Sequence, residues 1–306
     1  MHRSLLDWLA CPETGAPLSL RYEVADSRGS IVSGELVSSS GTIYPIRGGI
    51  PRFVDRDKYV TSFTMQRRYM KSRFDAWASE TGREERFAKL TGFELGGAAG
   101  KLFLDAGCGY GRYAAAVAQS GGTVVGIDLS TDSIELAQSY LGARENVHLI
   151  QADLQHPPLR RDLFDLVYSI GVLHHTPDTR ASFDALIPFV KPGGRIAIWV
   201  YAPEDKRFDD VLRKATVHMP SWSVLGVGAV RHVLGQGVRR VVLRRKDARV
   251  FSSFWPDVMG QFDSLAPRYA YVHTAAEVQQ WFEAAGLSEL RTGPIRTSVS
   301  GTRPQV

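Results

Sequence analysis

Cysteine is nearly absent from this sequence of 306 residues, which contains only Cys11 and Cys108. Two cysteines are too few for a disulfide framework or for a zinc site with four cysteine ligands. Their scarcity is typical of proteins from a reducing compartment, so we expect a cytoplasmic protein.

Long apolar runs are also absent. The most apolar stretch, 222–238, is interrupted by Arg231 and His232, so no run approaches the roughly 18 uninterrupted apolar residues of a membrane-spanning helix. The stretch from Leu5 to Cys11 contains Asp7 and is too short for the apolar region of a signal peptide. We therefore expect no transmembrane segment and no signal peptide.

The overall charge excess is small, because 37 Lys and Arg stand against 32 Asp and Glu, a net charge of +5. Basic residues are concentrated in 239–249, where six of eleven residues are Lys or Arg. A solvated helix face, an anionic substrate or carrier and an acidic partner are three interpretations of this run. Peripheral membrane contact through 222–249, which includes Trp222, is a fourth.

Two parts of the chain differ in pattern. Residues 1–57 hold short alternating stretches separated by Gly, Ser and Pro, which predicts a small antiparallel β unit. Residues 58–306 form the second predicted domain, with helices near 62–90 and an inserted cap at about 203–270. Short apolar runs alternate with helical patterns from about 101 to 201, which is typical of a parallel sheet covered on both faces. The second predicted domain also contains a helix capped by Thr274 and a pair of strands at about 287–293 and 296–302.

A glycine-rich turn directly follows the first apolar run of the second domain and reads Asp105-Ala106-Gly107-Cys108-Gly109-Tyr110-Gly111-Arg112. Glycines here let the backbone approach a ligand at the start of a helix. A dinucleotide fingerprint would need a third glycine where Arg112 stands, which argues against NAD. Asp128 and Asp153 close the next two predicted strands, and an acidic residue at the second strand end can accept hydrogen bonds from ribose.

In this pattern the chain resembles class I S-adenosylmethionine-dependent methyltransferases. The matching segments are Leu104 to Gly111, Gly126-Ile127-Asp128, Ala152-Asp153-Leu154, Phe164-Asp165 to Leu173-His174-His175, and Lys191-Pro192-Gly193-Gly194. The resemblance implies a Rossmann-like, doubly wound α/β fold, with a seven-stranded sheet that ends in an antiparallel hairpin. It also implies S-adenosyl-L-methionine as the cofactor.

The same resemblance implies a set of cofactor contacts. The backbone at Gly107 and Gly109 would contact the amino acid portion of the cofactor, and Asp105 would orient it. Asp128 would hold the ribose. The remaining expected contacts are Asp153 at the adenine amino group, Leu129 and Leu154 on the two faces of the ring, and Ser169 and Ile170 along the methionine side.

His174 and His175 follow the fourth strand of the predicted sheet, where an acceptor would lie, and a near-neutral imidazole suits general-base work. In one interpretation at least one of the two histidines contacts the acceptor. In the other, one histidine only forms a hydrogen bond with the backbone that shapes the loop. Ser169-Ile170-Gly171-Val172 lacks the Asn/Asp-Pro-Pro-aromatic loop of enzymes that methylate base amines, so nucleic acid is disfavoured as substrate.

We therefore expect methylation of a small-molecule acceptor, with O-methylation of a natural product or sugar derivative as the first choice. An RNA methyltransferase and a non-catalytic cofactor-binding scaffold are the alternatives, and a homo-oligomer is compatible with all three.

The N-terminal stretches Leu5 to Pro12 and Tyr44 to Pro51 are similar to a small zinc-ribbon-like domain that accompanies some methyltransferases. In metal-binding versions Cys11 would open a C-x-x-C pair, but position 14 is Thr and no second pair exists. We expect no metal site here.

Overall fold

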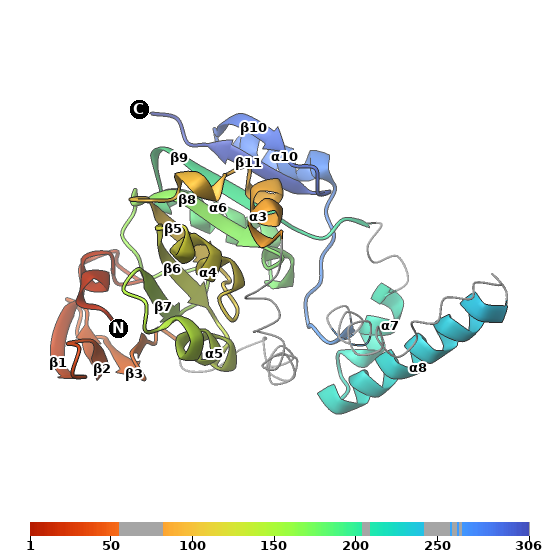
Figure 1. Cartoon of the computed structure of the whole chain (residues 1–306), viewed down its shortest axis with the longest axis horizontal. Coiled ribbons are helices and arrows are strands. Elements are labelled where there is room, and N and C mark those ends of the chain that lie inside the picture. The colour runs from red at the N-terminus through yellow and green to blue at the C-terminus, as the bar shows by residue number, and fades with distance from the viewer. Residues whose placement is uncertain (55–81, 204–208, 242–257, 259–261, 263–264, 306) are drawn as a thin grey trace.

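The computed structural model describes residues 1–54, 82–203, 209–241, 258, 262 and 265–305 (Figure 1). Within these ranges the chain forms two sheets. The smaller, antiparallel sheet has the order β1-β2-β3-β4, and the larger has the order β10-β11-β9-β8-β5-β6-β7. The expected division into 1–57 and 58–306 stays a prediction, because its boundary lies outside the described residues.

The larger sheet confirms the predicted fold. Its strands are β5 (Leu102–Ala106), β6 (Thr123–Asp128), β7 (Val147–Gln151), β8 (Phe164–Ile170), β9 (Val190–Trp199), β10 (Ser288–Thr292) and β11 (Ser298–Thr302). β5 pairs in parallel with both β6 and β8, whereas β11 runs antiparallel to β9 and β10. From β5 the chain moves to one side of the sheet through β6 and β7, and it then crosses to β8 and β9 on the other side of β5. In such folds ligands bind at the point where the strand order reverses, here between β5 and β8.

Both faces of this sheet are covered, which explains why its central strands are almost wholly apolar. Successive residues point to opposite faces, so Phe103 belongs to one apolar cluster and Leu104 to the other. The Phe103 face packs on helices α3 (Arg83–Thr91), α4 (Arg112–Gln119) and α5 (Thr131–Leu141). The Leu104 face packs on α6 (Thr179–Leu186) and α10 (Ala275–Ala284).

The start of α10 is fixed by the predicted cap. The Thr274 hydroxyl accepts a hydrogen bond from the Glu277 N–H at 3.1 Å, which satisfies one of the donors at the helix start. The Glu277 carboxylate does not complete a capping box, because its Oε1 bonds His273 Nδ1 at 2.8 Å. His273 also bonds the Thr179 hydroxyl at 3.1 Å through Nε2. The terminal helix is thereby tied to α6.

The N-terminal unit packs against the β7 edge of the larger sheet (Figure 1). It contains the turn η1 (Arg3–Asp7) and the strands β1 (Ser19–Ala25), β2 (Ile31–Val37), β3 (Ile43–Arg47) and β4 (Ile50–Pro51). Arg52 forms a parallel bridge with Gln151, and the Phe53 N–H donates to the Gln151 carbonyl at 2.9 Å. Leu5 and Leu9 belong to the same apolar cluster as strand residues of the larger sheet. The two parts therefore share one core.

The segment expected to be a cap is described only in part. It contains α7 (Asp209–Thr216) and α8 (Ser221–Val241), and buried Val224, Phe262 and Leu265 form a small apolar cluster of their own. Residues 55–81 and most of the basic run 239–249 lie outside the described residues. No helix in the described ranges has the length and apolarity needed to cross a membrane.

We predict that the docking of the N-terminal unit makes the protein acid-sensitive through His148. This residue is buried against Trp8 and His2, with ring centroids 5.0 and 5.7 Å apart. Burial lowers the pKa of His148 from 6.5 to about 4, and the neighbouring His2 acts in the same direction. The unfolded chain therefore binds this proton between those two values and the folded chain does not, so stability falls as the pH falls through this window.

Between pH 7 and pH 5 this group alone should lower the free energy of unfolding by about 2 kcal/mol. Urea denaturation of wild type and His148→Gln at both pH values measures the difference. His218→Gln, at an exposed position, is the control and should keep the wild-type pH dependence. An unchanged pH dependence in His148→Gln would refute the assignment.

Candidate active site

The strand ends that the sequence singles out are neighbours in the larger sheet. Asp105 lies near the end of β5, Asp128 ends β6, Asp153 follows β7, and Ser169 lies near the end of β8. Their order across the sheet is β8-β5-β6-β7, so the four residues line one edge at the carboxyl ends of the strands. This edge is the candidate site.

Asp128 links the two loops at the centre of this edge. Its Oδ2 accepts a hydrogen bond from the Gly109 N–H at 2.8 Å, and its Oδ1 accepts one from the Ser130 N–H at 2.9 Å. The carboxylate is thus fixed by both the glycine-rich turn and the loop that opens α5. Each carboxylate oxygen has two lone pairs, so each can accept one further hydrogen bond from a ligand.

The glycine-rich turn has the backbone that its sequence predicts, with φ of 87° at Gly107, 59° at Gly109 and 86° at Gly111. Its N–H groups, however, are used inside the protein. The Gly107 and Cys108 N–H groups both donate to the Ile127 carbonyl, at 2.8 and 2.9 Å, and the Gly109 N–H donates to Asp128. A diphosphate would need these donors. What the turn offers a ligand is acceptors, which suit an ammonium group better than an anion.

Asp105, directly before the glycine-rich turn, adds a carboxyl group to the acceptors at this edge of the sheet. Its carboxyl is buried, and Oδ2 has no partner within normal hydrogen-bond distance, although the Tyr168 hydroxyl and the Ala114 N–H lie close enough to act on the carboxyl and lower its pKa. Burial raises the pKa of Asp105 to about 7, and the negative charge of Asp128 acts in the same direction. A buried carboxyl of this kind is stabilised as the carboxylate by a cationic group placed next to it. The site therefore fits the ammonium group in the amino acid portion of S-adenosylmethionine.

The expected adenine contacts lie beyond Asp128. Leu129 and Leu154 are both buried, at the ends of β6 and β7. Asp153 Oδ1 accepts a hydrogen bond from the Gln155 N–H at 3.1 Å, so this carboxylate also shapes its own loop. The two leucines and Asp153 follow neighbouring strands, as a shared binding site requires.

Ser169 and Ile170 end β8 on the other side of β5. The Ser169 hydroxyl is fully buried and donates to the Ala106 carbonyl at 2.7 Å, which joins the ends of β8 and β5. This hydroxyl proton is therefore not available to a ligand in this conformation. Ile170 is partly buried and packs on the α3 and α4 side of the sheet.

His174 and His175 form the short helix η4 (Leu173–His175) and have different surroundings. His174 is fully buried, and its ring lies on the Tyr201 ring with centroids 3.8 Å apart. His175 Nδ1 lies 2.8 Å from the Tyr269 carbonyl oxygen. Because a carbonyl only accepts, Nδ1 must carry the proton, and neutral His175 then has its lone pair on Nε2.

The segment 269–273 holds this histidine loop, a contact that sequence reasoning missed. The Tyr271 N–H donates to the His174 carbonyl at 3.0 Å, and the His273 N–H donates to the Tyr201 carbonyl at 2.9 Å. The Tyr271 hydroxyl donates to the Pro177 carbonyl at 3.2 Å. No local pattern identifies these contacts, because backbone groups make most of them.

A second missed contact reaches the site from the N-terminal unit. Gln151 Oε1 accepts from Arg52 Nη1 at 2.8 Å, while Gln151 Nε2 donates to the Leu129 carbonyl at 3.0 Å. Arg52 also pairs with Glu135 on α5 at 2.9 Å. The loop that follows Asp128 is therefore connected to the N-terminal unit.

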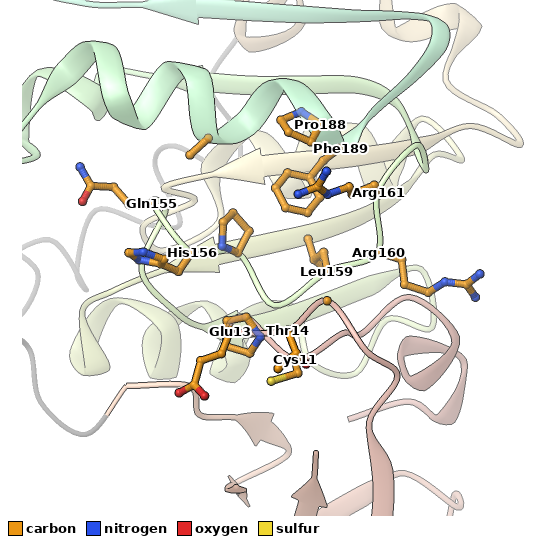
Figure 2. Close-up of a pocket in the computed structure, with 14 residues that line it drawn as sticks. Cys11, Glu13, Thr14, Gln155, His156, Leu159, Arg160, Arg161, Pro188 and Phe189 are labelled. Carbon is orange, nitrogen blue, oxygen red and sulfur yellow. The ribbon is translucent and has the colours of Figure 1, made fainter. Parts of the chain in front are cut away.

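A pocket of about 650 Å³ lies between the N-terminal unit and the loop that follows β7 (Figure 2). Cys11, Glu13 and Thr14 line it from one side, and His156 and Arg161 come from the loop. It contains none of the expected cofactor or acceptor residues. No cluster of three or more His, Cys, Asp or Glu side chains suited to a metal ion occurs in the described part of the chain.

Comparison with known proteins identifies the region that contains this site. Residues 104–198 match the family model described as a methyltransferase domain. The chain is 36% identical over 104 residues to a ubiquinone biosynthesis O-methyltransferase of Hydrogenovibrio crunogenus, covering 33% of this chain and 41% of that protein. It is 34% identical over 118 residues to Methyltransferase GfsG of Streptomyces halstedii, covering 37% and 42%.

A longer match, over 172 residues at 30% identity, is to a ubiquinone biosynthesis O-methyltransferase of Idiomarina loihiensis and covers 52% of this chain and 63% of that protein. The chain thus spans from two fifths to just under two thirds of the length of these three relatives.

We predict that Gly107 is required because Val172 occupies the space above it. An added Cβ at Gly107 would overlap both Cγ atoms of Val172, on a backbone with positive φ. Gly107→Ala should therefore lower the free energy of unfolding by about 3 kcal/mol, part from backbone strain and part from overlap. In a Val172→Ala background the same substitution should cost about 1 to 2 kcal/mol less, because the overlap with the two Cγ atoms is relieved while the contact with the Val172 Cβ at 2.8 Å and the backbone strain remain.

Chemical denaturation of the four proteins in this cycle measures both effects. Gly96→Ala, which meets open space without positive φ, is the matched control. Equal costs in the two backgrounds would show that Val172 is not the obstacle.

Proposed function

Since residues 104–198 match the methyltransferase domain model, we propose that the protein is a class I S-adenosylmethionine-dependent methyltransferase that methylates a hydroxyl group of a small molecule, a natural product or a sugar derivative. The observation that carries the proposal is the Asp128 carboxylate, fixed by two backbone N–H groups beside the glycine-rich turn. The names of the relatives support oxygen as the methylated atom of the acceptor, because two of the three relatives are named O-methyltransferases.

When bound, S-adenosylmethionine supplies a methyl group on a sulfonium, which a nucleophilic oxygen takes in one in-line displacement. The protein's main contribution to such a step is to position the reactants and exclude water. A base is needed only where the acceptor must lose a proton.

We assign the ribose to Asp128, because its two oxygens keep lone pairs in fixed directions. Asp105 is assigned to the amino acid portion, whose ammonium group would replace the water that burial removes from this carboxylate. The backbone at Gly107 and Gly109 gives close approach to the same portion. Because the N–H groups of both glycines are used internally, the turn would contribute carbonyl oxygens.

The other assignments follow the strand order. Leu129 and Leu154 would hold the adenine ring between apolar side chains, and Asp153 would accept from its amino group. Ser169 and Ile170 would border the methionine side, with the Ser169 hydroxyl fixing the strand end through Ala106 rather than donating to the cofactor.

Of the two histidines we propose His175 as the general base. The Tyr269 carbonyl fixes its tautomer and leaves the lone pair on Nε2, the arrangement that a base requires. His174 packs against the rings of His175 and Tyr201 and would orient them.

Calorimetric titration with S-adenosylmethionine and S-adenosylhomocysteine tests the proposal, with NADH as a negative control. Wild type should bind the first two. Asp128→Ala should bind each at least about tenfold more weakly, because hydrogen bonds to a charged acceptor are lost. Asp132→Ala, a substitution in the first turn of α5, is the matched control and should bind as wild type does.

Thermal unfolding of each variant separates loss of binding from loss of fold. Unchanged affinity in folded Asp128→Ala would remove the ribose assignment, and preference for NADH would remove the proposed function.

The histidine assignment predicts different effects of two substitutions. With an acceptor found by product mass, His175→Ala should lower kcat by about a hundredfold or more and remove the acidic limb of the pH profile, as loss of a general base does. His174→Ala should lower kcat less and keep that limb. Cofactor affinity should stay at the wild-type value in both. Wild-type turnover in His175→Ala would show that His175 is not the general base.

A further inference from the structure

Helix α8 presents an apolar face to solvent. Trp222, Val230, Val233 and Leu234 are 70%, 58%, 60% and 64% exposed. With exposed Gly226 they recur at helical spacing along one side of the helix. Soluble proteins seldom expose apolar side chains in such a continuous row unless the row binds something.

The opposite side of α8 is the one that packs on the protein. Val224 and His232 are buried there, and Val224 joins Phe262 and Leu265 in a small cluster. The helix lies apart from the larger sheet in Figure 1, so its exposed face does not belong to the sheet core. The helix is therefore held from one side and open on the other.

The charge of this segment limits what can cover the face. The sequence from 211 to 246, which includes all of α8, contains eight Lys and Arg and no Asp or Glu. Because the whole chain carries +5, the remainder of the chain is net negative. Positive charge is thus concentrated in the stretch of sequence that contains the apolar face.

We propose that α8 binds the surface of an anionic lipid bilayer and lies in the plane of its headgroups. An exposed row of aliphatic side chains with a Trp near one end, on a helix whose sequence contains three Arg and no acidic residue, is the pattern of an interfacial helix. A second copy of this chain fits the face less well, because two such basic segments would repel each other. The proposal is independent of methyl transfer.

Flotation of the full chain with vesicles tests this surface without cofactor or acceptor. Wild type should float with phosphatidylcholine vesicles that contain about one third phosphatidylglycerol and stay behind with pure phosphatidylcholine. Raising the salt from about 0.1 M to about 0.5 M should weaken binding, because the basic residues are then screened. Equal binding to both vesicle types would contradict the proposal.

The apolar contribution is tested by Trp222→Ser/Val233→Ser/Leu234→Ser. This variant should bind anionic vesicles about tenfold or more weakly, because the inserted apolar area is lost. Tyr22→Ser/Val24→Ser is the matched control, since both side chains are 53% exposed on β1. It should bind as wild type does. Equal binding of the α8 variant and wild type would overturn the proposal.

Two further measurements keep the result clear. Arg239→Gln/Arg240→Gln should also weaken binding while leaving the apolar face intact, which guards against misfolding of the triple variant. Light scattering tests the second-copy alternative: a wild-type dimer that the triple variant dissociates, together with no flotation, would refute the lipid assignment. If the protein bound an acidic protein and did not bind the vesicles, that result would refute the lipid assignment as well.

Discussion

The candidate site depends on one carboxylate that holds two loops together. Asp128 accepts the Gly109 N–H with one oxygen and the Ser130 N–H with the other. These bonds add to those from the Gly107 and Cys108 N–H groups to the Ile127 carbonyl, and together they fix the glycine-rich turn and the loop that opens α5 against the end of β6. The same carboxylate also raises the pKa of the neighbouring Asp105, in addition to the larger effect of burial. One side chain therefore contributes both to the loop geometry and to the raised pKa of Asp105.

This arrangement extends to the N-terminal unit through Gln151. Its side chain accepts from Arg52 and donates to the carbonyl of Leu129, the residue directly after Asp128. A buried amide with partners on both sides is costly to leave unpaired, so the three groups keep one arrangement. The small sheet consequently does more than cover the β7 edge, because it restrains a loop of the candidate site.

Sequence patterns were sufficient for the features that depend on neighbouring residues. The apolar strands, the glycine-rich turn before α4 and the Thr274 cap are all local, and the structure has them. Contacts across the chain could not be predicted. His175 and the Tyr269 carbonyl are 94 residues apart, and Arg52 and Gln151 are 99 apart. Ser169 illustrates a further limit, because its position indicates a lining residue while its hydroxyl is already bonded to Ala106.

The shared core has a consequence for the order of synthesis. Arg52 emerges from the ribosome 99 residues before Gln151, a delay of roughly 5 to 20 seconds at ordinary elongation rates. During that time the small sheet has its own strands but no β7 to pack on. Leu5 and Leu9, which the finished protein buries, then have only part of their surroundings. The N-terminal unit thus lacks its packing partner until β7 has been made, and during that time it is open to misassociation.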